Sequence, residues 1–179
     1  ESALNNLQAE LPGWNFDQTS KQARLAWRNE LSKIRVESVD QDKAKTFYTA
    51  LYHSLLAPTV VSDVDGGFRG SDFKAHKTDG FENYSTFSLW DTFRAEHSLL
   101  TIIETARVND LVNSCLVHAQ YHENKTLPIW TLASNETYCM IGYHSFPVIA
   151  EAYVKGFRSW DVEGLFKLMV DNTKRNDSW

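Results

Sequence analysis

The central motif of this sequence runs from Tyr84 to His97 and reads Tyr-Ser-Thr-Phe-Ser-Leu-Trp-Asp-Thr-Phe-Arg-Ala-Glu-His. It sets Trp90 beside Asp91 and places Arg94 about one helical turn beyond Asp91. A helix entered from an aromatic loop can present an indole, a carboxylate and a guanidinium together at the rim of a cleft. Sugar hydroxyls and sugar C–H faces need that mixture. Two interpretations stay open: a ligand site, or aromatic core residues beside a surface pair of Asp91 and Arg94.

The composition is that of a globular chain with many aromatic residues. The 179 residues are 42% apolar, which is enough for one domain with a sizeable core. A net charge of −5 disfavours nucleic acid and anionic membranes as partners, and no apolar run of about 18 residues predicts a membrane span. The six Trp either complete the core or line a ligand groove. We expect both cysteines, Cys115 and Cys139, to be buried thiols.

Helical periods dominate the chain, and strand signals are scarce except at Thr59–Val61. We expect Asp40 and Asp161 as N-caps and Gly156 as a C-cap. The sequence predicts six helices: from Asp17 or Thr19 to about 36, 40–57, 88–104, 109–122, 135–156, and one from 161 onward. Without a strand ladder, such helices pack in antiparallel pairs. The expected class is therefore all-α, and the wide apolar stripes of the second and fifth helices suit the inner layer of a two-layer helical ring.

The longest region without helical period runs from Ser62 to Asn83, and loops of this length are more often functional than structural. Asp63 and Asp65 resemble the start of a calcium loop of the EF-hand type. The following glycine comes too early, however, and Lys74 stands where the closing Glu belongs. An EF-hand is therefore disfavoured.

A second polar cluster follows Trp130 and contains Glu136 and His144. The sequence predicts both on one helix, with Glu136 in its first turn, where the helix dipole favours a carboxylate, and His144 two turns later. A helix cap and a core histidine are the plainer interpretation, which the residue types favour. The functional interpretation places both side chains beside Trp90 and Asp91 at the rim of one cavity. The sequence shows no zinc-ligand spacing, phosphate-binding loop or Gly-x-Ser-x-Gly elbow.

Several long motifs together resemble the catalytic domain of glycoside hydrolase family 92, the calcium-dependent exo-acting α-mannosidases. The matching segments are Phe47–Pro58, the Asp65-Gly/Arg69-Gly loop, Tyr84–Arg94, Leu127–Trp130 with Asn135-Glu-Thr, Met140–Ser145 and Ala152–Gly156. The resemblance extends from about Ala26 to the last residues. At Ser98 we expect the family to favour Pro, which concerns a helix turn rather than the sugar site.

The resemblance implies an (α/α)6 catalytic domain, normally preceded by a β-sandwich, in a bacterial periplasmic or secreted enzyme that removes terminal α-mannose with inversion. It implies that Trp90 and Asp91 contact the mannose. Glu136 and His144 are weaker candidates for the same pocket wall. The resemblance also implies a calcium ion that grips the sugar, with ligands mostly outside this chain.

Two motifs that carry the general acid and the general base in this family, Thr-Leu-Glu-Tyr and Asn-Asp-Asp-x-Gly-Gln, do not occur in the sequence. We therefore expect residues 1–179 to form a single helical segment, about half of an (α/α)6 barrel, that binds an α-mannoside glycan. It would hold no catalytic residue of its own and would need the remainder of the catalytic domain as a partner. We expect the isolated chain to be inactive and to associate through uncovered apolar faces. The alternatives are a non-catalytic helical carbohydrate-binding module and a purely structural one.

Overall fold

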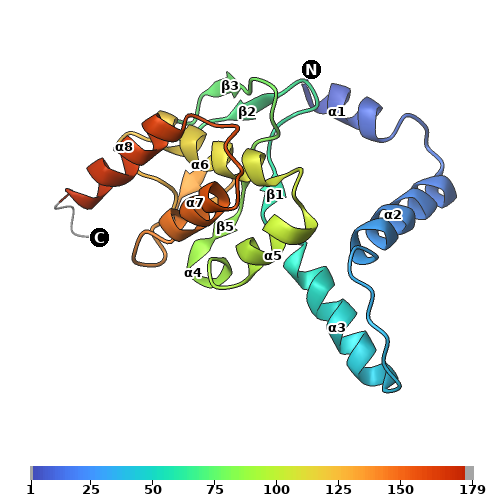
Figure 1. Ribbon diagram of the computed structural model, residues 1–179. Helices are drawn as coiled ribbons and strands as arrows, with labels where there is room; N and C mark the ends of the chain where they lie inside the picture. Colours follow the sequence, from blue (N-terminus) through green and yellow to red (C-terminus); the bar gives the residue numbers. More distant parts are fainter. Residues whose placement is uncertain (1, 176–179) are drawn as a thin grey trace. The chain divides into compact units, whose positions relative to one another are not determined.

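The computed structural model describes residues 2–175 and divides into two compact units, one up to Ala57 and one from Pro58 onward (Figure 1). About half of the described residues are helical. The helices are α1 (Ser2–Glu10), α2 (Phe16–Leu31), α3 (Gln41–Ser54), α4 (Leu89–Thr92), α5 (Glu96–Ile103), α6 (Val108–Tyr121), α7 (Ser145–Val154) and α8 (Val162–Thr173). The strands are β1 (Thr59–Val60), β2 (Gly67–Arg69), β3 (Ala75–Lys77), β4 (Tyr84–Ser85), β5 (Phe87–Ser88), β6 (Trp130–Leu132) and β7 (Asn135–Glu136).

The all-α expectation is therefore only partly right, because a mainly helical chain also carries small sheets. The half-barrel and the single segment spanning 1–179 stay predictions. Residue 1 and residues 176–179 lie outside the described part. Within residues 2–175, every helix is too short or too polar to span a bilayer.

Polar caps fix the starts of α2 and α3 in the first unit. The Asn15 side chain accepts a hydrogen bond from the Gln18 backbone N at 3.0 Å, so α2 begins earlier than expected. Asp40 Oδ1 accepts from the backbone N of Asp42 and of Lys43, each at 3.1 Å. The predicted cap of α3 is thus confirmed.

The first unit has little core of its own. Trp27 of α2 meets Tyr52 of α3 with ring centroids 4.6 Å apart, and the Tyr48 hydroxyl accepts from the Val36 backbone N at 3.1 Å. Only Leu51 is buried among the residues of its described helices. Its large exposed apolar side chains include Trp14, Phe16 and Val39. The apolar side of α3 is therefore only partly covered within the described residues of this unit.

Three small antiparallel sheets belong to the second unit. β1 pairs with β4, β2 pairs with β3, and β6 lies between β5 and β7. Thr86 separates β4 from β5 with a φ of 65°, and its hydroxyl lies 2.9 Å from that of Thr59. This bend sends two consecutive strands into two different sheets. The loop expected from 62 to 83 contains the β2–β3 hairpin, which the sequence did not indicate.

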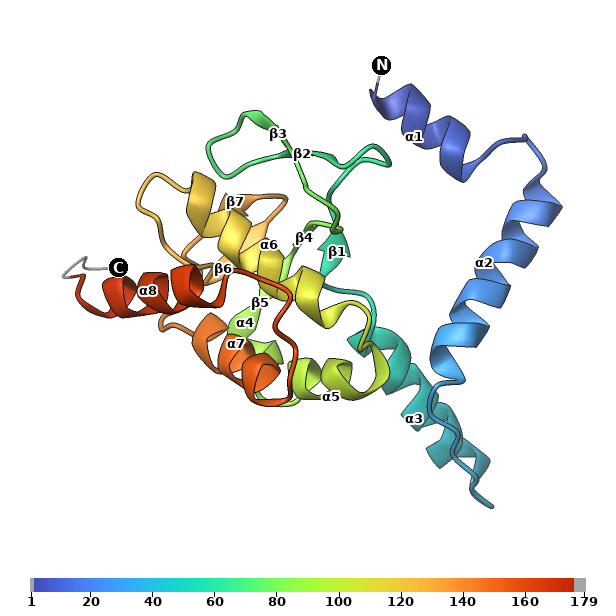
Figure 2. The same ribbon diagram turned by 45° about the horizontal axis from the view of Figure 1, so that its top comes forward.

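The core of the second unit lies around α6. Buried residues recur on this helix at spacings of three, four and seven, which is the pattern of one helical face. α6 contacts α7 and β4, and α5 contacts α7, beside which it lies in Figure 2. The core side chains of these elements include Leu100, Val108, Leu111, Val112, Cys115, Ala119, Val148, Ile149 and Ala152.

The ends of α7 and α8 confirm two further predictions. Gly156 has a φ of 97°, its N–H donates to the Tyr153 carbonyl, and Phe157 N donates to the Ala152 carbonyl, each at 3.0 Å. Asp161 Oδ1 accepts from the Gly164 backbone N at 2.9 Å and begins α8.

Two predicted helices are wrong in part. The helix expected over 88–104 breaks at Ala95, whose φ of −148° and ψ of −34° are not helical, into α4 and α5. The helix expected over 135–156 begins only at Ser145, because Asn135–Glu136 is a strand and Gly142 has a φ of 86°. Cys115 is buried as predicted, but Cys139 lies in this non-helical stretch and is exposed.

Candidate functional site

The Trp90–Asp91 pair lies on α4, a single helical turn that follows β5. Leu89 anchors this turn because its side chain is fully buried. The two residues after it diverge: Trp90 is half-buried and Asp91 is exposed. The turn therefore presents a half-buried indole next to a carboxylate that solvent can reach.

An aromatic cluster surrounds the indole. The His144 ring, which comes from the start of α7, lies 5.1 Å from the Trp90 ring at 77° and 4.6 Å from the Phe93 ring at 42°. Arg94 Cζ lies 5.9 Å from the centroid of Trp90 and 5.1 Å from that of Phe93, within reach of cation–π attraction. Trp90, Asp91 and His144, three of the predicted site residues, are thus brought to one corner. We call this set, Trp90, Asp91, Phe93, Arg94 and His144, the α4 corner.

A second carboxyl group belongs to the same corner and was missed by sequence reasoning. Burial, and then the negative charge of Asp91, raise the pKa of Glu96 to about 7. Glu96 Oε1 is buried and has no hydrogen-bond partner among the described residues. Glu96 lies five residues after Asp91, and side chains at that spacing are not neighbours on one helix. The proximity of the two carboxyl groups could therefore have been predicted only from the break between α4 and α5.

Glu136 has a different position from the one predicted. It lies on β7, is buried, and accepts three backbone hydrogen bonds: from Ile129 N at 2.8 Å, from Trp130 N at 2.9 Å and from Tyr138 N at 3.0 Å. Both carboxylate oxygens are therefore engaged. No hydrogen bond or ring contact within residues 2–175 joins Glu136 to the α4 corner. Its observed role is to fasten the β6–β7 hairpin, and a sugar contact stays a prediction.

A buried histidine lies behind Glu136. His118 Nε2 is 3.7 Å from Glu136 Oε2, and burial, followed by the charge of His122, lowers the pKa of His118 to about 3. The imidazole is therefore neutral at ordinary pH. This pair lies inside the second unit and has the character of core structure rather than of a reaction centre.

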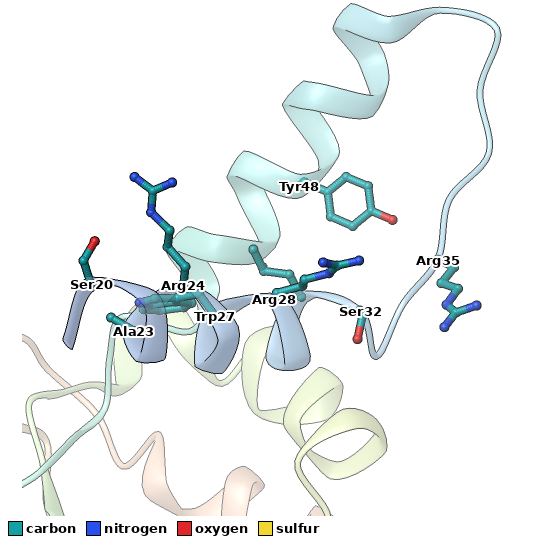
Figure 3. Close-up of a pocket in the computed structure, with 9 residues that line it drawn as sticks. Ser20, Ala23, Arg24, Trp27, Arg28, Ser32, Arg35 and Tyr48 are labelled. Atoms are coloured by element: carbon teal, nitrogen blue, oxygen red, sulfur yellow. The ribbon is translucent and has the colours of Figure 1, made fainter. Parts of the chain in front are cut away.

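The first unit has a large open pocket that contains none of the predicted site residues. It measures about 640 Å³ and is lined by Trp27, Tyr48 and the guanidinium groups of Arg24, Arg28 and Arg35 (Figure 3). None of its lining residues is a carboxylate, cysteine or histidine. Its ionised groups are therefore all cationic, and they stand beside the hydroxyl groups of Ser20, Ser32 and Tyr48.

The described residues do not hold a metal centre. Within residues 2–175, no group of three or more His, Cys, Asp or Glu side chains could bind a metal ion. Asp65 Oδ1 instead accepts from the Gly67 backbone N at 2.9 Å and closes a turn. A calcium ion with ligands mostly outside this chain stays a prediction.

The chain matches the family model of the glycosyl hydrolase family 92 catalytic domain over residues 2–179. The solved family GH92 α-mannosidase BT3965 from Bacteroides thetaiotaomicron is 38% identical with a TM-score of 0.93, covering 98% of this chain and 24% of that chain. Its structure in complex with mannoimidazole is equally similar, at 38% identity and a TM-score of 0.93, covering 98% of this chain and 23% of that chain.

A third solved structure extends the comparison. The family GH92 inverting mannosidase BT2199 from Bacteroides thetaiotaomicron VPI-5482 is 27% identical with a TM-score of 0.89, covering 99% of this chain and 24% of that chain. The chain thus spans about a quarter of the length of these solved relatives. A search of curated proteins gives no match.

Proposed function

Since this chain belongs to glycosyl hydrolase family 92, we propose that it is the mannose-binding part of a catalytic domain that removes terminal α-linked mannose with inversion. The activities given for its relatives support this proposal: one is an α-mannosidase that has been solved with mannoimidazole, and another is an inverting mannosidase. The observation that carries it is the α4 corner, where a half-buried indole and an exposed carboxylate stand side by side.

Two side chains of the α4 corner, Trp90 and Asp91, have the chemistry to contact a sugar directly. The Trp90 ring offers a flat apolar face for the C–H groups of a pyranose, and the His144 ring, which also contacts Phe93, packs against the indole edge to face. Asp91 accepts hydrogen bonds from sugar hydroxyls, and a charged acceptor makes such bonds about twice as strong as neutral ones. The corner therefore binds and orients the sugar but does not itself transfer protons.

The acid and the base belong elsewhere in this proposal. Inversion needs two carboxyl groups about 6.5–9.5 Å apart on opposite sides of the reacting carbon. The sequence motifs expected to carry them are absent from the 179 residues. We assign them, together with the ligands of a calcium ion and a periplasmic or secreted location, to the whole enzyme of which this chain would be a part.

A non-catalytic carbohydrate-binding module is the second candidate. Such a module would need only the α4 corner, whose indole and carboxylate can bind a sugar without cleaving it. The two candidates differ in the role of Asp91. In the mannosidase, Asp91 supports both sugar binding and turnover, whereas in the binding module it supports sugar binding alone.

The test is Asp91→Ala in a polypeptide that carries this chain together with the remainder of a family 92 catalytic domain. We expect kcat/KM for an α-mannoside to fall about 100-fold or more, because a charged contact that positions the sugar is lost. The matched control is Asp79→Ala, which removes another exposed carboxylate of the same unit. Equal activity of the two variants, with circular dichroism unchanged in both, would refute the role of the α4 corner.

A further inference from the structure

The segment that delivers His144 to the α4 corner is tightly held on one side. Tyr143 donates its hydroxyl to the Asn172 carbonyl at 2.9 Å and stacks on Phe146 with centroids 4.9 Å apart. His144 itself is the residue before α7 and makes no capping hydrogen bond with its side chain. Its imidazole is held by ring contacts with Trp90 and Phe93.

The Cε1 edge of that imidazole lies next to Gly142. An ideal Cβ at this position would lie 2.8 Å from His144 Cε1 and 3.4 Å from Nδ1, and the first distance is shorter than real Cβ contacts. Gly142 also has a φ of 86°, which an L side chain rarely adopts. The glycine thus leaves the space that the ring fills.

The other neighbours of the imidazole belong to the sugar site. Trp90 and Phe93 lie against it at 5.1 Å and 4.6 Å between ring centroids. A side chain at Gly142 could be accommodated only if the ring moved, and Tyr143 keeps the backbone from moving with it. The displaced ring would then leave its contact with the indole.

We infer that Gly142 is a positioning residue of the mannose site: it seats the His144 imidazole against Trp90 and so sets the plane on which the sugar packs. This inference rests on the proposed function of the α4 corner. The contact between His144 and Trp90 can be measured without any sugar, so it can be tested separately.

The experiment compares Gly142→Ala with Gly80→Ala in the 179-residue chain. Gly80 has a φ of 75° and nothing within 4 Å of its ideal Cβ, so its variant carries a similar backbone strain without a collision. We expect Gly142→Ala to lose the nuclear Overhauser effect between the His144 ring protons and the Trp90 indole protons. Mannose affinity should fall on the order of tenfold, because misplacement by a fraction of an ångström to one ångström costs this much or more. Gly80→Ala should change neither.

A rescue variant covers the case in which Gly142→Ala unfolds. If the new Cβ collides with the imidazole, removing the imidazole should remove the collision. The urea midpoint of the Gly142→Ala/His144→Ala double variant should then differ from that of His144→Ala by no more than Gly80→Ala differs from the unaltered chain. A larger shift in that double variant would overturn the inference, as would a Gly142→Ala chain that keeps both the Overhauser effect and the affinity. Loss of the Overhauser effect in a chain whose unaltered form binds no mannose would support the positioning role and refute the proposed function instead.

Discussion

At the scale of single residues, folding raises the pKa of Glu96, which lies close to the α4 corner. Its folded pKa of about 7 stands above the ordinary value of 4.5. Folding therefore favours the protonated carboxyl, so Glu96 stabilises the folded chain below about pH 4.5, and this contribution is lost as the pH rises through about 7. We expect Glu96→Gln to be more stable than the unaltered chain at pH 8 by about 1 kcal/mol, a value reduced because the carboxyl stays partly exposed.

The measurement is the free energy of unfolding in urea at pH 5, 6, 7 and 8. The matched control is Glu163→Gln, which removes an exposed carboxylate from the first turn of another helix, α8. A constant difference between Glu96→Gln and the unaltered chain at all four pH values would contradict the prediction, since the difference should grow from about pH 4.5 to about pH 7 and then level off.

Sequence reasoning succeeded for residues whose chemistry and neighbours lie within one motif. Trp90 and Asp91 are adjacent in the chain, and the α4 corner keeps them adjacent in space. His144 joins them from a distant segment, as the functional interpretation of the sequence expected. The strand position of Glu136 was not predicted, because strands of two and three residues leave no period in a sequence. Its carboxylate accepts hydrogen bonds from backbone N–H groups at both ends of the β6–β7 hairpin.

At the scale of elements, the packing of α5 on α7 depends on a polar bridge at the position where we expect the family to favour Pro. Ser98 Oγ donates to Glu151 Oε2 at 2.7 Å, and Lys155 Nζ, which lies 2.6 Å from Glu151 Oε1, also donates to Thr101 Oγ1 at 2.7 Å. The hydroxyl thus bonds a charged acceptor on the neighbouring helix. We expect Ser98→Ala to destabilise the chain by about 1–2 kcal/mol, as for other hydrogen bonds to charged groups.

Thr173→Ala is the control for this bridge, because its hydroxyl donates to the Val170 carbonyl within its own helix at an exposed position. Its effect on the urea midpoint should stay within about 0.5 kcal/mol. If both variants shift the midpoint equally, the Ser98–Glu151 bond contributes nothing beyond a local hydroxyl, and α5 and α7 are held by apolar contacts alone.

Helix ends were predicted correctly at Asp40, Gly156 and Asp161, where a side chain or a glycine makes the cap, but the cap at Asn15 was missed. The break between α4 and α5 was not predicted, because Ala95 carries no signal that stops a helix. The start of α7 was misplaced for a related reason. Met140 and Ile141 continue the apolar spacing of a helix, yet both are exposed in the segment where Gly142 turns the chain.

At the scale of the whole molecule, the two units differ in how much of their apolar surface is buried. The second unit buries a contiguous apolar set around α6, whereas the helices of the first bury only Leu51. Exposed side chains such as Trp14 and Phe16 fit the expectation that this chain works as part of a larger structure. Composition predicted a globular protein but could not assign the core to one unit, because the aromatic residues are spread over both.

The last prediction concerns what the 179 residues do unaided. We expect saturable binding of mannose by calorimetry but no release of aryl alcohol from an aryl α-mannoside at pH 5 to 7 above a heat-denatured sample. The reason is that the α4 corner can orient a sugar, whereas inversion needs a proton donor and a water-activating base held about 6.5–9.5 Å apart. Cleavage by the purified chain would contradict this expectation. If Glu96→Gln then abolished that cleavage while mannose binding survived, Asp91 and Glu96, two carboxyl groups whose environments differ, would have to serve as the reacting pair.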